Sequence, residues 1–384
     1  MPISRRRLLG RFGASAAAVV AASELAADAF GVTLNGSPRD AIRSGRPIRL
    51  HRNENRRGPS AKVIAAMRDA VANVAGRYPD VESDVLRRKI ARYHGIAPEH
   101  VVLGCGSGEI LRSAIQTSTG RQKKIVTALP TFESIHEHAR RAGAVVVGVP
   151  LSKDYSHDVG AMLASTDRAT GLVYICNPNN PTGSLTRRQD LEELLRKLPL
   201  DVTVLIDEAY HDYVGESAGS TSFIDHAVHD RRVIVTRTFS KIHGLAGLRI
   251  GYGVATSQTA RSLTSHGLSD SVSVVAARAA AGALDDQEYV RLNVDWNADD
   301  RQEFLNQANA RMLRSIDSLT NFVMLDTGRP AVPVFEHFAK HGVLVSRPVP
   351  AFESYIRVSM GTPAAMREFW RVWDLMPGGH MMAM

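Results

Sequence analysis

Short apolar runs alternate with amphipathic stretches along most of the chain, beginning at about residue 85. The runs are rich in Val, Ile and Leu, which is typical of strands that are buried on both faces. They predict strands at Val101–Leu103, Ile125–Leu129, Val145–Val149, Leu172–Cys176, Val202–Ile206, Val233–Thr236 and Ile250–Val254. The polar-apolar stretches between them, such as the ones from Glu109 and through Glu133–Arg141, predict helices.

This alternation predicts an α/β fold, because strands separated by helices form βαβ units with right-handed crossovers and a mostly parallel sheet. The pattern changes near Gln287, where a long charged helix is predicted as far as Arg314. A second group of strands follows, at Phe322–Leu325, Val343–Val345 and Tyr355–Val358. With 384 residues the chain is long enough for a large domain and a smaller α/β domain.

The first 60 residues follow neither pattern. Arg5, Arg6 and Arg7 precede a mildly apolar run over 12–22, and small residues follow at 27–29, which resembles a twin-arginine export signal. The apolar run is too short for a membrane span, which needs about 20 residues. We expect export to the periplasm or beyond; the alternative is a basic tail on a protein that stays in the cytoplasm. Further on, an extended arm should enter a helix capped by Ser60.

Charge and cysteine content exclude several classes of protein. The formal net charge is +8, but the first 30 residues hold four arginines against two carboxylates, and the other basic residues are scattered. No basic patch interleaved with aromatic residues is present, so we predict no nucleic-acid binding. Cys105 and Cys176 are the only cysteines and lack zinc-site spacing, which predicts free thiols and no metal site.

Lys241 is the first candidate for chemistry, since the chain has only eight lysines among 47 basic residues. It follows a predicted strand in Thr238-Phe239-Ser240-Lys241, and Arg249 lies eight residues further on in a glycine-rich segment. A lysine so placed can form a Schiff base with an aldehyde cofactor, while hydroxyls and an arginine hold a phosphate. Taken alone, the motif also fits a lysine on a surface loop.

A glycine-rich turn follows the strand at Val101–Leu103 and opens a helix at Gly106-Ser107-Gly108. Free amides at a helix N-terminus form a phosphate cradle. A dinucleotide-binding fold also uses such a turn, but it requires an acidic residue after the second strand. That strand ends in Ala128-Leu129-Pro130, so the cradle for a phosphate alone is favoured.

Other polar residues follow further strand ends, in the order Asn180, Asp207, Tyr210, Lys241 and Arg249. In open α/β sheets, ligands bind outside the carboxyl ends of the strands. From about Leu50 to Trp373, the chain resembles the pyridoxal-phosphate enzymes of the aspartate-aminotransferase fold (type I). Within that fold it is similar to the histidinol-phosphate aminotransferase subfamily.

The resemblance implies roles around a pyridoxal 5'-phosphate cofactor. Lys241 would form the Schiff base, and Asp207 would sit on the pyridine nitrogen and keep it protonated. Asn180 and Tyr210 would hydrogen-bond the phenolic oxygen. Phe132 would lie on the ring face, although it also fits an ordinary core aromatic.

The phosphate would be held by the amides of Gly106, Ser107 and Gly108 together with Thr238, Ser240 and Arg249. Tyr78 resembles the tyrosine that reaches the phosphate of a neighbouring subunit, which implies a homodimer. Arg357 would bind the substrate α-carboxylate as a fork, with Asn180 beside it.

The resemblance also implies a domain division. Residues 31–75 would be the arm with part of the small domain, 76–285 the large cofactor-binding domain and 286–375 the rest of the small domain. Residues 1–30 would be the export signal and 376–384 a tail.

The chain departs from this subfamily at several positions. Arg56 and Arg57 replace Pro-Tyr, and Gly108 replaces an aspartate. Ser346 stands where relatives that bind a phosphorylated substrate have arginine, and Arg347 follows one residue later, which on a strand faces the other side. Arg57 would line the substrate side-chain pocket and favour an acidic donor, or else would point to solvent.

We therefore expect a homodimeric aminotransferase that moves an amino group from an L-amino acid to a 2-oxo acid by a ping-pong route. A decarboxylase or other lyase of the same fold is the first alternative. A cofactor-binding protein without catalytic activity is the second.

Overall fold

The computed structural model describes residues 47–119, 123–215 and 222–377. The predicted export signal, residues 1–30, lies outside the described residues, as does most of the predicted tail. From Pro47 onward the described residues belong to one unit. In this part of the chain, no helix is both long and apolar enough to cross a membrane.

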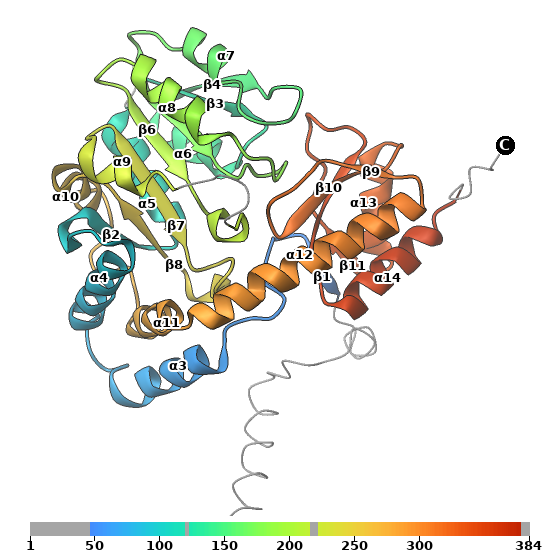
Figure 1. Cartoon of the computed structure of the whole chain (residues 1–384), viewed down its shortest axis with the longest axis horizontal. Coiled ribbons are helices and arrows are strands. Elements are labelled where there is room, and N and C mark those ends of the chain that lie inside the picture. Colours follow the sequence, from blue (N-terminus) through green and yellow to red (C-terminus); the bar gives the residue numbers. More distant parts are fainter. Residues whose placement is uncertain (1–46, 120–122, 216–221, 378–384) are drawn as a thin grey trace, which may run out of the picture. The chain divides into compact units, whose positions relative to one another are not determined.

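Seven strands form the central sheet, in the order β2-β8-β7-β6-β5-β3-β4 (Figure 1). They are β2 (Val101–Cys105), β3 (Lys124–Leu129), β4 (Val145–Pro150), β5 (Thr170–Cys176), β6 (Thr203–Asp207), β7 (Val233–Thr238) and β8 (Ile250–Val254). Neighbouring strands from β4 to β7 pair in parallel. Strand β8 runs antiparallel to both β7 and β2. The predicted mostly parallel sheet is confirmed; the reversal of β8 was not predicted.

Helices cover both faces of this sheet, because successive strand residues point to opposite sides. Val204 and Ile206 pack in one hydrophobic cluster, whereas Leu205 between them packs in another. The first cluster includes α4 (Asp80–His94), α7 (Val159–Ala164), α8 (Arg188–Lys197), α9 (Ile224–His229) and α11 (Val274–Leu284). The second includes α5 (Ser107–Ser118), α6 (Ser134–Ala142) and α10 (Ser257–Ser265).

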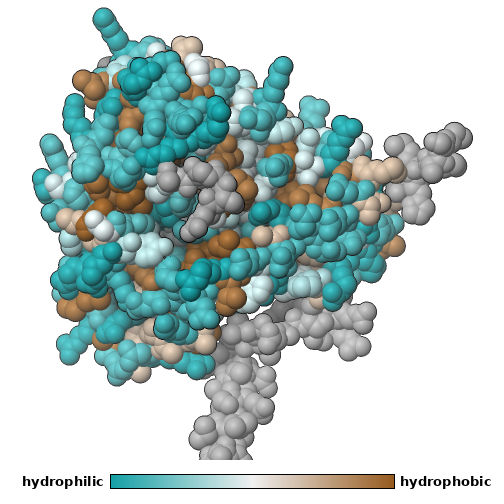
Figure 2. All heavy atoms as spheres, viewed as in Figure 1, coloured by the Kyte–Doolittle hydropathy of each residue, from teal (hydrophilic) through white to brown (hydrophobic). Residues whose placement is uncertain are grey.

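The long helix α12 (Gln287–Ala310) leads into a second, smaller core (Figure 1). It ends four residues before the predicted bound, and Met312 then adopts a φ of 57°, which helical geometry does not allow. Its outward side is largely hydrophilic on the face in Figure 2. The smaller core contains β1 (Ile48–Leu50), β9 (Arg314–Ser315), β10 (Phe322–Asp326), β11 (Val343–Val345), β12 (Tyr355–Ser359), α13 (Ala331–Lys340) and α14 (Pro363–Asp374).

The residues between β1 and the first described helix connect these two cores. Strand β1 pairs in parallel with β11 of the smaller core. Helix α3 (Ala61–Asn73) packs instead against α11, and Ser60 caps it by accepting a hydrogen bond from the Val63 amide, as predicted. The segment 51–59, called the arm below, therefore runs from the smaller core to the larger one.

Candidate active site

The sheet topology brings the predicted site residues to one edge. Strands β5, β6 and β7 are parallel and end there, with Cys176, Asp207 and Thr236 in register on adjacent strands. Strand β8 is reversed, so its first residues lie at the same edge, and Gly251 pairs with Thr238. Loops that are far apart in the sequence thus meet where ligands of open α/β sheets bind.

Asp207 ends β6 and is almost fully buried, with 3% of its surface exposed. One carboxylate oxygen accepts a hydrogen bond from the Tyr174 hydroxyl at 3.1 Å. The other accepts from the Thr236 hydroxyl at 3.1 Å and from the Ala209 amide at 3.2 Å. Burial raises the pKa of Asp207 to about 6, against the effect of these hydrogen bonds. The carboxylate is fixed in place but lacks a directly paired cation among the described residues.

Tyr174 and Thr236 were not predicted as site residues. Thr236 is in register with Asp207, and Tyr174 lies two residues before Cys176, which is in register on the other side. Both are polar residues in otherwise apolar strands, and both lie on the same face of the sheet as Asp207. That pattern could have identified them.

Lys241 follows β7 and is partly buried. Its amine donates hydrogen bonds to the carbonyl oxygens of Arg52 at 3.2 Å and Asn53 at 3.1 Å, both in the arm. It also lies 5.4 Å from the centre of the Tyr210 ring. Burial, followed by the positive charge of Arg357, lowers the pKa of Lys241 to about 8. A substantial fraction of the amine is therefore neutral, and nucleophilic, slightly above neutral pH.

Arg357 comes from β12 in the smaller core and reaches across to the larger one. Its guanidinium donates to the side-chain oxygen of Asn180 and, at 3.1 Å, to the carbonyl oxygen of His51. The buried Nε has no hydrogen-bond partner among the described residues. Asn180 follows β5 and is 8% exposed, so this pair connects the two cores beside Lys241.

A cradle for an anion forms where β7, β8 and α5 meet. Helix α5 begins at Ser107, and its N-cap, Gly106, offers no side-chain cap. A Cβ on Gly106 would lie 2.3 Å from a guanidinium nitrogen of Arg249, so only glycine lets that guanidinium come so close to the helix end. Arg249 contacts the Ser240 hydroxyl at 3.4 Å, and Thr238 donates to the same hydroxyl at 3.0 Å. Free amides, hydroxyls and a guanidinium together match the needs of a phosphate.

Three other predicted residues have different surroundings. Phe132 is partly buried and packs against the core on the α5 and α6 side of the sheet, which is the environment of a core aromatic. A Cβ on Gly108 would have no neighbour within 4 Å. Tyr78 lies between α3 and α4 with 80% of its surface exposed, so its predicted role, which requires a second chain, stays a prediction.

The arginines of the arm are engaged by α12. Arg57 stacks on Trp296, 3.9 Å from the ring centre, and lies 3.8 Å from an Asp300 carboxylate oxygen. Arg56 hydrogen-bonds the same carboxylate. The predicted role of Arg57 in the substrate pocket stays a prediction, since these contacts direct its guanidinium to α12.

Ser346 and Arg347 follow β11 and point in opposite directions. Ser346 is buried and donates to the carbonyl oxygen of His51 at 3.0 Å, whereas Arg347 is exposed. The position next to the arm therefore carries a neutral hydroxyl, and what this means for the substrate stays a prediction.

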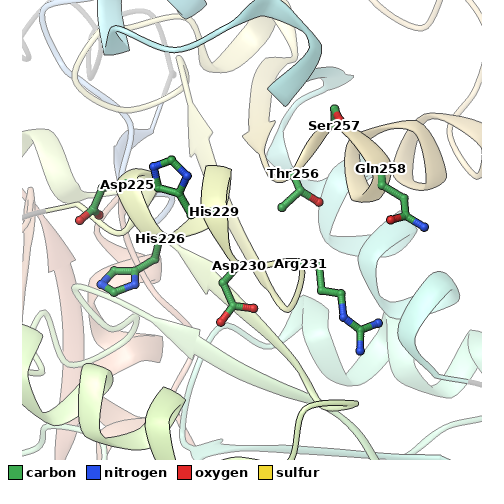
Figure 3. Close-up of a pocket in the computed structure, with 8 residues that line it drawn as sticks. All are labelled: Asp225, His226, His229, Asp230, Arg231, Thr256, Ser257 and Gln258. Carbon is green, nitrogen blue, oxygen red and sulfur yellow. The ribbon is translucent and has the colours of Figure 1, made fainter.

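A separate surface hollow lies between α9 and the start of α10 (Figure 3). Two of its acidic side chains already have cationic partners, since Asp225 pairs with Arg188 and Asp230 with Arg232. His226 stacks on the Phe223 ring. None of the residues placed at the sheet edge line this hollow, so the cluster around Lys241 is the better candidate.

Comparisons with known proteins agree with this choice. The family model for aminotransferase class I and II matches residues 46–372. Histidinol-phosphate aminotransferase 2 of Carboxydothermus hydrogenoformans is 36% identical over 323 residues, which cover 84% of this chain and 88% of the relative. The histidinol-phosphate aminotransferase of Methylobacillus flagellatus is 37% identical over 336 residues, which cover 87% of this chain and 89% of the relative.

A solved structure extends the likeness to three dimensions. The histidinol-phosphate aminotransferase of Sinorhizobium meliloti, in complex with pyridoxal-5'-phosphate, superposes with a TM-score of 0.80 at 29% identity. The match covers 88% of this chain and 94% of that one. The chain therefore belongs to the class I and II aminotransferases and is a pyridoxal-phosphate-dependent transaminase.

Proposed function

We propose that the enzyme transfers an amino group from an L-amino acid to a 2-oxo acid at the cluster formed by Lys241, Asp207 and Arg357. The observation that carries this proposal is the Lys241 amine, which has a pKa of about 8 and, within the described part of the chain, hydrogen-bonds only to main-chain carbonyl oxygens. Such an amine is available to react with an aldehyde.

The residues present fit pyridoxal phosphate. The cradle of Gly106, Ser240 and Arg249 suits the phosphate, since its hydroxyls and guanidinium converge on a helix N-terminus. Asp207 is a buried acceptor without a paired cation among residues 47–119, 123–215 and 222–377, which suits a protonated ring nitrogen. The bound cofactor supplies an electron sink when the substrate Cα–H bond breaks.

Each side chain then has a defined task. Asp207 would keep the ring nitrogen protonated. Burial disfavours the charged form of its carboxylate, and a protonated nitrogen beside it would stabilise that form. Lys241 Nζ would take the proton from the substrate Cα and return it to the aldehyde carbon of the cofactor. Arg357 would bind the substrate α-carboxylate, and its hydrogen bond to Asn180 would orient the guanidinium. Tyr210 would donate to the phenolic oxygen.

The names of the relatives make histidinol phosphate the first amino donor to test. Two observations favour an unphosphorylated donor instead. Ser346 next to the arm is neutral and buried, while Arg347 points to solvent. Arg57 is held on α12 by Trp296 and Asp300. We infer that neither Arg347 nor Arg57 binds a phosphate group on the donor.

We also propose a homodimer. Tyr78, Val81 and Val85 form an exposed apolar strip at the start of α4, with exposed fractions of 80%, 61% and 41%. A second copy would bury this strip and allow Tyr78 to reach the partner's phosphate cradle. Light scattering should give the dimer mass, and Val81→Asp should shift it toward the monomer.

Two measurements test the catalytic proposal. Borohydride reduction of the yellow protein should leave a pyridoxyl group on the Lys241 peptide. Mass spectrometry of products from pooled amino acids and 2-oxoglutarate should show glutamate and new 2-oxo acids. Amines as the main products would indicate a decarboxylase, and no product would indicate a non-catalytic protein. An adduct on another lysine contradicts the proposal.

Export by the twin-arginine route remains part of the proposal. Replacement of Arg5, Arg6 and Arg7 by lysine should retain the protein in the cytoplasm, because the translocase recognises paired arginines. An unchanged exported fraction would count against the signal.

A further inference from the structure

Asn53 occupies a special place in the arm. It is 2% exposed and adopts a left-handed backbone conformation, with φ 54°. Asparagine tolerates this conformation better than most residues. As a result, its main chain and its side chain both face the candidate active site.

The hydrogen bonds of Asn53 fix the orientation of its carboxamide. The Asn53 amide N–H donates to the Ser359 hydroxyl oxygen at 2.8 Å. Ser359 has only one hydroxyl hydrogen, and it donates this hydrogen to Asn53 Oδ1 at 3.0 Å. The other end of the carboxamide, Nδ2, therefore faces Tyr210 and donates to its hydroxyl oxygen at 3.0 Å.

This orientation determines what the Tyr210 hydroxyl can do. Because its oxygen already accepts a hydrogen bond from Asn53, its own hydrogen must be donated elsewhere. Tyr210 is 3% exposed, so water does not compete freely for that hydrogen. The Lys241 amine lies 5.4 Å from the centre of the same ring, so the Tyr210 hydroxyl belongs to the surroundings of the reactive lysine.

The main chain of Asn53 contacts the same group of residues. Its carbonyl oxygen accepts from the Lys241 amine at 3.1 Å and from the Asn321 side chain at 3.1 Å. Ser359 lies on β12, two residues after Arg357, and therefore on the same face of that strand. Asn53 thus connects β12 of the smaller core with Tyr210 and Lys241 of the larger one.

We propose that Asn53 is a positioning residue that directs the Tyr210 hydroxyl hydrogen toward the phenolic oxygen of the bound cofactor. This inference rests on the proposed attachment of the cofactor to Lys241. A donor on that oxygen lowers its affinity for protons, so the cofactor–lysine linkage loses its proton at lower pH. Without Asn53 the Tyr210 hydroxyl is free to rotate, and the pH midpoint rises.

The experiment measures the pH midpoint of the visible absorbance band in the holoenzyme. Asn53→Gly removes the carboxamide and keeps the left-handed backbone without strain. We expect its midpoint to rise by about one pH unit, the range for one weakened hydrogen bond to a charged group. In a Tyr210→Phe background, Asn53→Gly should produce no further rise, because the two changes act through one hydroxyl.

A second variant protects the test against a folding defect. Asn53→Asp keeps the size of the side chain and its tolerance of the left-handed conformation, but it replaces the donor by an acceptor. The Tyr210 hydroxyl would then donate to the new carboxylate, and the midpoint should rise at least as far as in Asn53→Gly. Asn306→Asp, on the exposed side of α12, is the matched control and should leave the midpoint unchanged.

The inference is overturned if neither Asn53 variant moves the midpoint, or if the rise is equal with and without the Tyr210 hydroxyl. It is also overturned if Tyr210→Phe itself causes no rise. These outcomes differ from failure of the proposed function, in which the wild-type protein has no visible band or carries the cofactor on another lysine.

Discussion

Asp207 and Glu208 are neighbours in sequence, and each is 3% exposed, yet their surroundings are opposite in kind. Glu208 accepts from Arg237 at 2.7 Å, from the Ser222 hydroxyl at 2.7 Å and from the Phe223 amide at 2.7 Å. Although burial opposes it, the charge of Arg237 holds the pKa of Glu208 below its ordinary value. The donors to Asp207 in the described structure are all neutral, and burial raises its pKa.

The difference separates a carboxylate that the protein pairs with its own cation from one that it does not. Glu208 and Arg237 neutralise each other, and Arg237 also reaches Asp212 at 2.8 Å, so this network is complete in the protein alone. The Asp207 carboxylate is held in place by hydrogen bonds but is not neutralised. A buried carboxylate of this kind destabilises the apoprotein and is stabilised by a cationic ligand.

The largest effect on stability should come from removing the cation that pairs with Glu208, because Glu208 would then be unpaired like Asp207. Arg237→Met leaves the buried Glu208 and the partly buried Asp212 without their cation, and we expect a loss of about 3–5 kcal/mol in the free energy of unfolding. Denaturant unfolding of the apoprotein measures it, with Arg347→Met at an exposed position as the control. A loss below about 1 kcal/mol, the usual contribution of a surface ion pair, would show that the network is not a structural one.

Asp207→Asn tests the functional side of the comparison. Turnover should fall by about 10²–10³-fold, the cost of losing one preorganised electrostatic contact, because the ring nitrogen is no longer held protonated. Steady-state kinetics measure turnover, and the visible band shows that the cofactor is still bound. Near-normal turnover in a cofactor-loaded variant would contradict the role of Asp207.

The same substitution should stabilise the apoprotein. A carboxyl whose pKa is raised from 3.8 to about 6 by folding contributes stability below pH 3.8 and loses it as the pH rises through 6. Asp207→Asn has no such titration, so above pH 6 the free energy of unfolding of the variant should exceed that of wild type by on the order of 3 kcal/mol. Thermal or denaturant unfolding at several pH values should show that this difference in stability shrinks toward pH 4. A difference that stays constant with pH would exclude the titration of Asp207 as its cause.

The smallest effect concerns Lys241 and the rate at which apoprotein takes up the cofactor. Only the neutral amine attacks an aldehyde, and the pKa of Lys241 is about 8. The rate should therefore rise about tenfold per pH unit below pH 8 and level off above it. Stopped-flow absorbance follows the reaction, and a rate independent of pH between 6 and 8 would contradict this pKa.

Most of the fold could be predicted from the sequence, because burial on both faces leaves a local apolar pattern in each strand. The predicted bounds of β8 and β11 agree with the structure. The direction of β8 could not be predicted, since an apolar run reads the same in either direction. The end of α12 was predicted four residues too late. The left-handed residue just after the helix is Met312, whereas such a position is usually marked in the sequence by a glycine.

For the candidate site, the order of polar residues along the chain was enough to identify the reactive groups near the strand ends: an asparagine, an aspartate, a tyrosine, a lysine and an arginine. The partners of these groups became known from the folded structure. Tyr174 supports Asp207, Asn53 orients Tyr210, and α12 engages Arg57. Tyr174 is 33 residues from Asp207 and Asn53 is 157 residues from Tyr210, and such contacts leave no local periodicity in the sequence. They arise when register and packing bring the strands and the arm together, and these same contacts set the pKa values on which the chemistry depends.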